Sequence, residues 1–177
     1  PAAAMSDYQA EKLRRALTAF DGSSESLGKL LDYILQDLSG LPAEEWQKAQ
    51  AVDSRWAVRS FTGVQIKPRR LWLGPNGETL GLFTPDESGS RQFDRRLGVG
   101  RSKQLLSRVV EWLRRTGQSL ALVTNGRQGR LVHAGTDYEA WCEWDIELWF
   151  SEGQPAAQTL IWRTLLNRST LLAEQGQ

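Results

Sequence analysis

Residues that cross-link chains or ligate metals are scarce in this sequence of 177 residues, which has one cysteine, one histidine and one methionine. A single cysteine, Cys142, excludes an internal disulfide framework and a cysteine zinc cluster. A single histidine, His133, excludes the metal sites and catalytic triads that need a second histidine.

Long hydrophobic runs are also missing. No stretch approaches the roughly 18 apolar residues of a membrane-spanning helix, so we expect no membrane partner. The opening residues lack the basic and apolar regions of a secretory signal, so we expect a cytoplasmic protein. We interpret residues 1–5 as a cloning scar that ends at Met5.

The composition that remains is typical of a globular protein, with 40% hydrophobic and 24% charged residues. The charge is unevenly distributed along the chain. Residues 55–115 hold 13 basic and 5 acidic side chains, a net charge of +8, whereas residues 135–152 hold 6 acidic side chains and no basic one. This distribution makes the molecule electrically polar but does not by itself identify nucleic acid as a partner.

Hydrophobic spacing predicts a helical, acidic preface over residues 6–54. Apolar residues recur at helical intervals over 7–20 and 25–39, with Ser24 as the expected N-cap of the second helix. Residues 43–50 are expected to add a short polar helix.

Residues 55–177 predict an α/β domain, in which a mixed sheet is flanked by helices; a single domain over 6–177 is the alternative. The Asn-Gly pair within 74–77 predicts a hairpin. The expected strands are 66–73, 79–83, 120–123, 130–134 and 143–150. The expected helices are 102–115 and 156–166, and the alternative for the second helix is an end at Leu172.

The basic stretch supplies candidate contacts to DNA phosphates. Arginine predominates there, and its guanidinium binds phosphate in a bidentate manner. We select Arg69, Arg70, Arg95, Arg96, Arg101 and Lys103. The alternative is a solvated face whose cations pair with the acidic segment. Residues 98–103 precede a helix but lack the Walker and Rossmann patterns, which leaves a turn or a phosphate-holding loop.

The acidic segment suggests a second surface. If residues 143–150 form a regular strand, Glu143, Asp145 and Glu147 share one face. That face could be solvated, could dock a basic partner or could hold Mg²⁺. Trp141 and Trp149 have the same parity and are candidate interface residues.

Several short motifs occur together in a recognisable order. Gln104-Leu105-Leu106 opens a helix, and a strand ending in Thr124-Asn125-Gly126 follows. The same set of motifs also includes the segments Leu71–Pro75, Gly81–Phe83 and 134–150. Over roughly residues 60–166 the chain resembles the N-terminal nuclease-like domains of type I restriction subunits and of large restriction-modification or phage-defence adenine methyltransferases of the BREX, DISARM and type IIG kind.

The resemblance implies a PD-(D/E)XK nuclease-like core, in which an Asp on one strand and a Glu-X-Lys on the next hold Mg²⁺. This sequence departs from that pattern. The second strand corresponds to 79–87, where Asp86 and Glu87 occur without a lysine two residues later, and Gly129 replaces the tryptophan that the family has before Arg-Leu. We therefore expect a scaffold that has lost its catalytic set and needs no cofactor.

The leading hypothesis is a non-catalytic domain of a DNA restriction or phage-defence protein that contacts DNA backbone or docks partner domains or subunits. One alternative is an active Mg²⁺-dependent nuclease that uses Asp86, Glu87 and Lys103. Another is a protein-interaction module that uses the Trp141 and Trp149 face without DNA binding.

Overall fold

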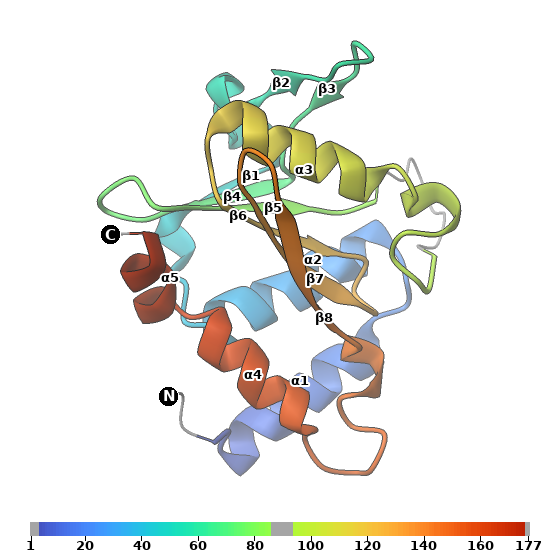
Figure 1. Cartoon of the computed structure of the whole chain (residues 1–177). Coiled ribbons are helices and arrows are strands. Elements are labelled where there is room, and N and C mark those ends of the chain that lie inside the picture. The colour runs from blue at the N-terminus through green and yellow to red at the C-terminus, as the bar shows by residue number, and fades with distance from the viewer. Residues whose placement is uncertain (1–3, 86–93, 176–177) are drawn as a thin grey trace.

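A six-stranded mixed sheet forms the centre of the molecule in a computed structural model that describes residues 4–85 and 94–175 (Figure 1). The sheet order is β1-β4-β5-β6-β7-β8. The strands are β1 (Trp46–Lys48), β4 (Arg70–Leu73), β5 (Thr79–Phe83), β6 (Leu120–Thr124), β7 (Gly129–Ala134) and β8 (Glu139–Trp144). The predicted α/β class with a mixed sheet is confirmed.

All neighbouring strands pair antiparallel except β5 and β6, which are parallel. Helix α3 (Leu105–Thr116) lies between β5 and β6 in the chain and makes this crossover. The predicted hairpin joins β4 to β5, and Gly77 adopts a φ of +92° in its turn, a conformation that glycine reaches without steric cost.

The two faces of the sheet bury separate apolar clusters because alternate strand residues point to opposite sides. Phe83, Val123 and Trp112 of α3 belong to one cluster. A small two-stranded sheet, β2 (Val58–Arg59) with β3 (Gln65–Ile66), lies beyond α3 in Figure 1 and adds Ile66 to the same cluster.

The opposite face is covered by helices from both ends of the chain (Figure 1). Leu82 and Leu122 from the sheet join Leu13, Leu31 and Trp162 from these helices in one core. The helices on this face are α1 (Asp7–Ala19), α2 (Ser24–Asp32) with a π-helical extension (Tyr33–Leu38), α4 (Ala157–Leu165) and α5 (Arg168–Gln175). The helical preface therefore shares its core, and through β1 its sheet, with the rest of the chain.

Three local predictions were wrong. Residues 43–50 do not form one helix, because β1 at 46–48 pairs with β4 between two short 3-10 turns. Residues 66–73 are split, since β3 and β4 belong to different sheets. The N-cap of α2 is Ser23, whose side chain accepts from the Ser26 N–H, and Ser24 is already helical.

The prediction of an acidic strand over residues 143–150 was also wrong. β8 ends at Trp144, and residues 146–148 form a 3-10 turn, so the carboxylates of Glu143, Asp145 and Glu147 are not aligned on one strand face. The predicted last helix over 156–166 is confirmed as α4 (Ala157–Leu165), but it does not extend to Leu172, because α5 is a separate helix. Across residues 4–85 and 94–175, no helix is both long and apolar enough to cross a bilayer.

Candidate nucleic-acid interface

A hollow of about 480 Å³ opens beside the end of β5, between the β2–β3 hairpin and the start of α3. Ligands of α/β proteins commonly bind at the carboxyl ends of parallel strands, and β5 is one of the parallel pair. We call this hollow the cationic pocket. Its lining is Ser24, Val64–Lys67, Arg69, Phe83–Pro85, Gln104, Leu105 and Arg108.

The charge of this lining has one sign. Lys67, Arg69 and Arg108 contribute three cations, and none of the described residues that line the pocket is acidic. None of the three cations has a carboxylate partner within the described part of the chain. Like charges gathered in this way repel one another, so the pocket favours an anion.

Arg69 is half-buried and is held by two hydrogen bonds. Its Nη2 donates to the Ser24 carbonyl at 3.0 Å, and its Nη1 lies 3.4 Å from the Thr84 hydroxyl oxygen. Burial, and to a lesser degree the neighbouring charge of Arg70, lower the pKa of Arg69 below its ordinary value. An anion would relieve both effects, because it would compensate the half-buried charge.

The start of α3 completes the polar side of the pocket. Arg108 donates through Nη2 to the side-chain oxygen of Gln104 at 3.1 Å, which leaves the Gln104 amide N–H groups available as donors. Gln104 is the N-cap residue but makes no side-chain capping bond. The partial positive charge of the helix N-terminus adds to that of the cations.

Arg70 has a different environment from its neighbour. Its side chain is 9% exposed, and its Nη1 lies 2.6 Å from Oδ1 of Asp32. Nη2 donates to the carbonyl of Gly28 at 3.1 Å. The prediction that Arg70 contacts phosphate is therefore wrong, because the guanidinium is buried against α2 and already neutralised.

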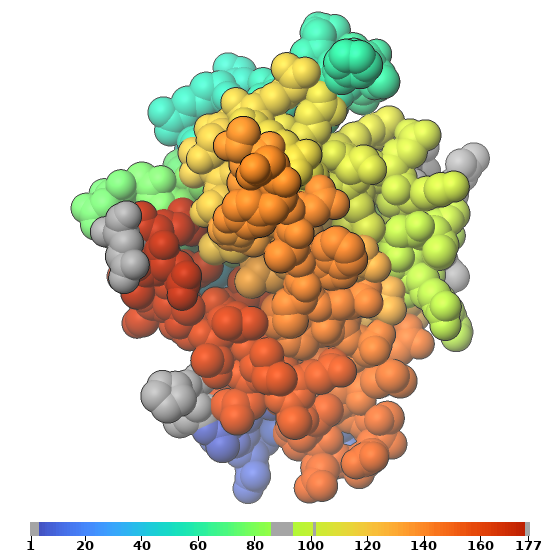
Figure 2. All heavy atoms as spheres, viewed as in Figure 1, coloured from blue at the N-terminus to red at the C-terminus, as the bar shows by residue number. Residues whose placement is uncertain are grey.

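Arg95 and Arg96 lie exposed on the loop that precedes α3, and Lys103 is also exposed. The segment containing them is on the surface at one side of the molecule, in yellow-green in Figure 2. These three residues remain candidate phosphate contacts. The backbone of Arg101 is described, but the position of its side chain lies outside the described structure.

The Thr-Asn-Gly motif holds this loop in place. Buried Asn125 donates to the carbonyl of Asp94 at 2.6 Å, while its side-chain oxygen accepts from the N–H groups of Arg127 and Gln128. Gln128 in turn accepts from the N–H of Leu97 at 2.9 Å. The motif thus has a structural role, which is to fix the basic loop against the β6–β7 turn.

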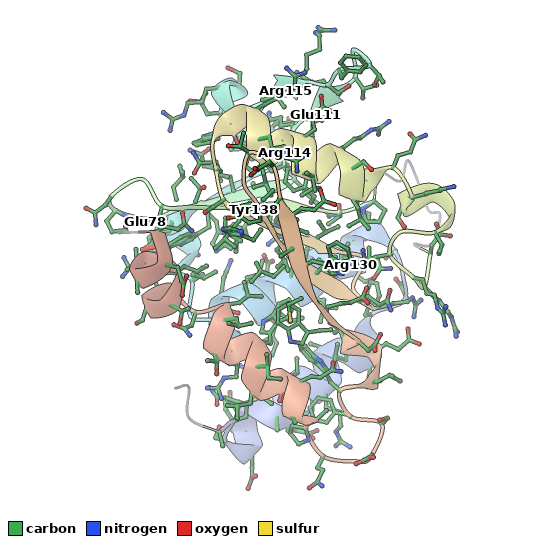
Figure 3. The ribbon with its side chains drawn as sticks, in the orientation of Figure 1. Glu78, Glu111, Arg114, Arg115, Arg130 and Tyr138 are labelled. Atoms are coloured by element: carbon green, nitrogen blue, oxygen red, sulfur yellow. The ribbon has the colours of Figure 1, made fainter. Side chains whose placement is uncertain are left out.

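Part of the acidic segment neutralises nearby arginines. Arg130, labelled in Figure 3, lies on β7 with its Nε 2.8 Å from Glu143 Oε1. Arg127 lies 3.8 Å from Glu147, and Asp145 accepts from the Gln128 side chain. The basic loop therefore borders compensated charges, in contrast to the cationic pocket.

The two candidate interface tryptophans are separated by the fold. Trp141 on β8 is 57% exposed. The guanidinium carbon of Arg130 lies over its indole ring, 5.5 Å from the ring centroid. Trp149 is fully buried and stacks edge-to-face with Trp162 at 5.5 Å. The prediction of Trp149 as an interface residue is wrong, because the 3-10 turn rotates it into the core.

The candidate catalytic residues are only partly placed. Asp86 and Glu87 lie outside the described residues, and Lys103 is an exposed residue before α3. β4 and β5 carry no carboxylate. In the described ranges, no group of three or more His, Cys, Asp or Glu side chains is arranged to hold a metal ion.

Lys67 and Arg108 are absent from the predicted phosphate contacts, although both line the cationic pocket. No spacing rule connects them, because Lys67 follows β3 and Arg108 lies in α3. The sequence signal for this pocket was Gln104, which is one of the residues that carry the family resemblance and which lines the pocket. Comparisons of the chain with protein-family models, curated proteins and solved structures found no match.

Proposed function

We propose that this chain is a nuclease-like domain of a DNA restriction or phage-defence protein that contacts the phosphate backbone of DNA without cleaving it. The observation that carries the proposal is the cationic pocket, which is lined by three cations that have no carboxylate partner among the described residues and by no described acidic residue. Phosphate contacts from arginine and lysine supply most of the sequence-independent affinity for DNA.

The strand arrangement supports the nuclease-like interpretation. β4 and β5 form an antiparallel pair, and α3 then crosses to a parallel β6. β4 and the strand that includes β5 are where the resemblance would place the Asp and the Glu-X-Lys. Arg69 and Arg70 stand at the start of β4 instead, and β5 ends at Phe83, before Asp86 and Glu87, which lie outside the described residues.

This exchange of residues changes the preferred ligand. Mg²⁺ requires oxygen ligands, usually carboxylates, whereas guanidinium and ammonium groups repel a cation and attract phosphate. A nuclease-like scaffold with this lining would keep affinity for the backbone while losing the metal that activates water.

Paired variants test the role of the pocket in DNA binding. Lys67→Ala with Arg108→Ala removes two pocket cations that have no carboxylate partner in the described ranges, and it leaves Arg69 in place to support α2. Fluorescence anisotropy with a labelled duplex of about 20 base pairs should show weaker binding and a salt slope reduced by about 2, roughly 1 per lost phosphate contact.

Arg115→Ala is the matched control, because it removes a cation from the other end of α3, where Arg115 pairs with Glu111 (Figure 3). Its binding curve should match that of the unaltered protein. If Lys67→Ala/Arg108→Ala binds DNA as tightly as the control at every salt concentration, the pocket does not contact DNA.

A second candidate function is the docking of another protein domain on Trp141. Trp141 lines a hollow of about 640 Å³ together with Val99, Leu106, Val110 and Val132, and exposed tryptophans with apolar neighbours are common at interfaces. A self-association that survives high salt and is lost in Trp141→Ala, with no DNA affinity, would favour this function over the first.

A further inference from the structure

We propose that the cationic pocket selects a phosphomonoester, the terminal phosphate of a nucleotide, over an internal phosphodiester. The nucleotide could stand at the 5′ end of a strand or be free in solution. This inference deepens the proposed function and rests on it, since it names the chemical group that the same pocket takes.

The charge of the pocket favours a monoester. An internal phosphodiester carries one negative charge, whereas a terminal phosphate carries about −1.5 to −2 near pH 7 and presents three strong acceptor oxygens. Three cations, Lys67, Arg69 and Arg108, line the pocket without carboxylate partners among the described residues. The dianion matches this charge more closely than the monoanion does.

The fixed position of Arg69 points the same way. Its half-buried guanidinium lines the pocket and donates to Ser24 and Thr84, whereas the side chains of Arg95 and Arg96 are exposed. An internal phosphate is attached to the chain on both sides and must lie along a surface. A terminal phosphate is attached on one side only and can enter a recess.

The remaining walls suit the rest of a nucleotide. Val64, Phe83, Pro85 and Leu105 also line the pocket and give it an apolar part. A volume of about 480 Å³ lies within the range of about 300–1,000 Å³ of pockets for small organic ligands. Gln104, whose oxygen is occupied by Arg108, can orient its amide N–H groups toward a phosphate oxygen.

Two duplexes of identical sequence test the inference, one with 5′-phosphate ends and one with 5′-hydroxyl ends, both labelled at a 3′ end. The full chain should bind the phosphorylated duplex about tenfold more tightly, a difference of about 1.4 kcal/mol. Arg108→Ala should reduce that preference markedly, and Arg115→Ala on the same helix should retain it.

Arg69→Lys is a second variant, because it keeps the charge but loses the fork of donors that holds both Ser24 and the phosphate. It should also lower the preference. A thermal unfolding curve of each variant identifies any loss of binding that is due to loss of the fold.

Competition distinguishes the two sources of the phosphate. If adenosine monophosphate displaces the labelled duplex but adenosine does not, the pocket takes a free nucleotide as well. If only a 5′-phosphorylated oligonucleotide competes, the strand end is the ligand.

Equal affinity for the two duplexes, together with no effect of adenosine monophosphate, would overturn the inference and leave the proposed backbone contact intact. Binding of adenosine monophosphate without binding of either duplex would support the phosphomonoester site and contradict the proposed DNA contact.

Discussion

Adjacent residues Arg69 and Arg70 have opposite roles, and the difference comes from what each guanidinium finds at α2. Arg70 reaches the carboxylate of Asp32, while the partners of Arg69 among the described residues are the neutral oxygens of Ser24 and Thr84. A buried charge with an oppositely charged partner has much of its desolvation cost compensated. A buried cation without such a partner is stabilised when an anion binds. Arg70 therefore stabilises the fold, and Arg69 is available for a ligand.

Arg70→Ala should destabilise the protein by about 2–3 kcal/mol, because it leaves Asp32 without its shortest ion pair and removes packing from a buried site. Arg15→Ala, which breaks an exposed pair with Glu11, should cost less than about 1 kcal/mol. Urea unfolding of both variants measures the difference, and equal costs would contradict the assigned role of Arg70.

The same pair predicts a pH dependence. Burial alone would raise the pKa of Asp32, but hydrogen bonds from Lys48 and Arg70 outweigh burial and lower it below its ordinary value of 3.8. Because the folded-state pKa is depressed, its contribution to stability is present above about pH 4 and is lost as the pH falls through the lower folded value. Asp32→Asn should flatten the fall in unfolding free energy measured in that acidic range.

The two tryptophans give a second comparison at this scale. Trp149→Ala should cost about 3–5 kcal/mol, as expected for the loss of a fully buried aromatic residue. Trp141→Ala should change the unfolding free energy by less than about 1 kcal/mol, because the side chain is more than half exposed. Chemical denaturation followed by circular dichroism measures both, and a large cost at Trp141 would show that it packs in the fold.

At the scale of elements, the β6–β7 turn connects the basic loop to the helical face. Asn125 fixes the loop through Asp94, and Gly126, with a φ of +83°, lies against the C-cap residue of α1, Phe20, and against Leu27 of α2. A Cβ placed on Gly126 would come within 2.6 Å of the Phe20 ring, closer than real contacts allow. The glycine is therefore required both by its backbone conformation and by packing.

Gly126→Ala should consequently be more damaging than Gly77→Ala, although both glycines have positive φ. A Cβ on Gly77 would meet nothing within 4 Å, so this change costs only the backbone strain of about 1–2 kcal/mol. Gly126→Ala adds overpacking of about 1–3 kcal/mol. Thermal denaturation of the two variants should give the lower midpoint for Gly126→Ala, and identical midpoints would contradict the contact with Phe20.

Elements with a strong local signal were predictable, and those fixed by distant contacts were not. The spacing of Leu105 through Leu113 predicted α3, and Asn76-Gly77 predicted the hairpin. The alternation over 143–150 favoured a strand, but there the chain leaves β8 and turns, with Asp145 held by Gln128 and Gln158. These partners come from separate segments, so no local pattern could reveal them.

At the scale of the whole molecule, the fold decides which charged side chains are paired, and the order of charges along the sequence does not reveal this. Arg130 and Arg127 of the β6–β7 region pair with Glu143 and Glu147 from the acidic segment. Lys67 and Arg69 of the cationic pocket lie between β3 and β4, and Arg108 comes from the distant helix α3. All three stay without carboxylate partners among the described residues. The sequence could predict an electrically polar molecule, but the site itself depends on which cations the fold leaves uncompensated.

The central claim is that these cations hold DNA phosphate on a scaffold without a catalytic set. The most direct measurement is the affinity of the unaltered chain for a labelled duplex over a salt series with Mg²⁺ present, with the recovered DNA then run on a denaturing gel. We expect affinity that falls steeply with salt, with a slope of about −0.9 for each phosphate contacted, and intact DNA. Absence of binding at the lowest salt would contradict the phosphate contacts, and cleaved DNA would contradict the loss of the catalytic set.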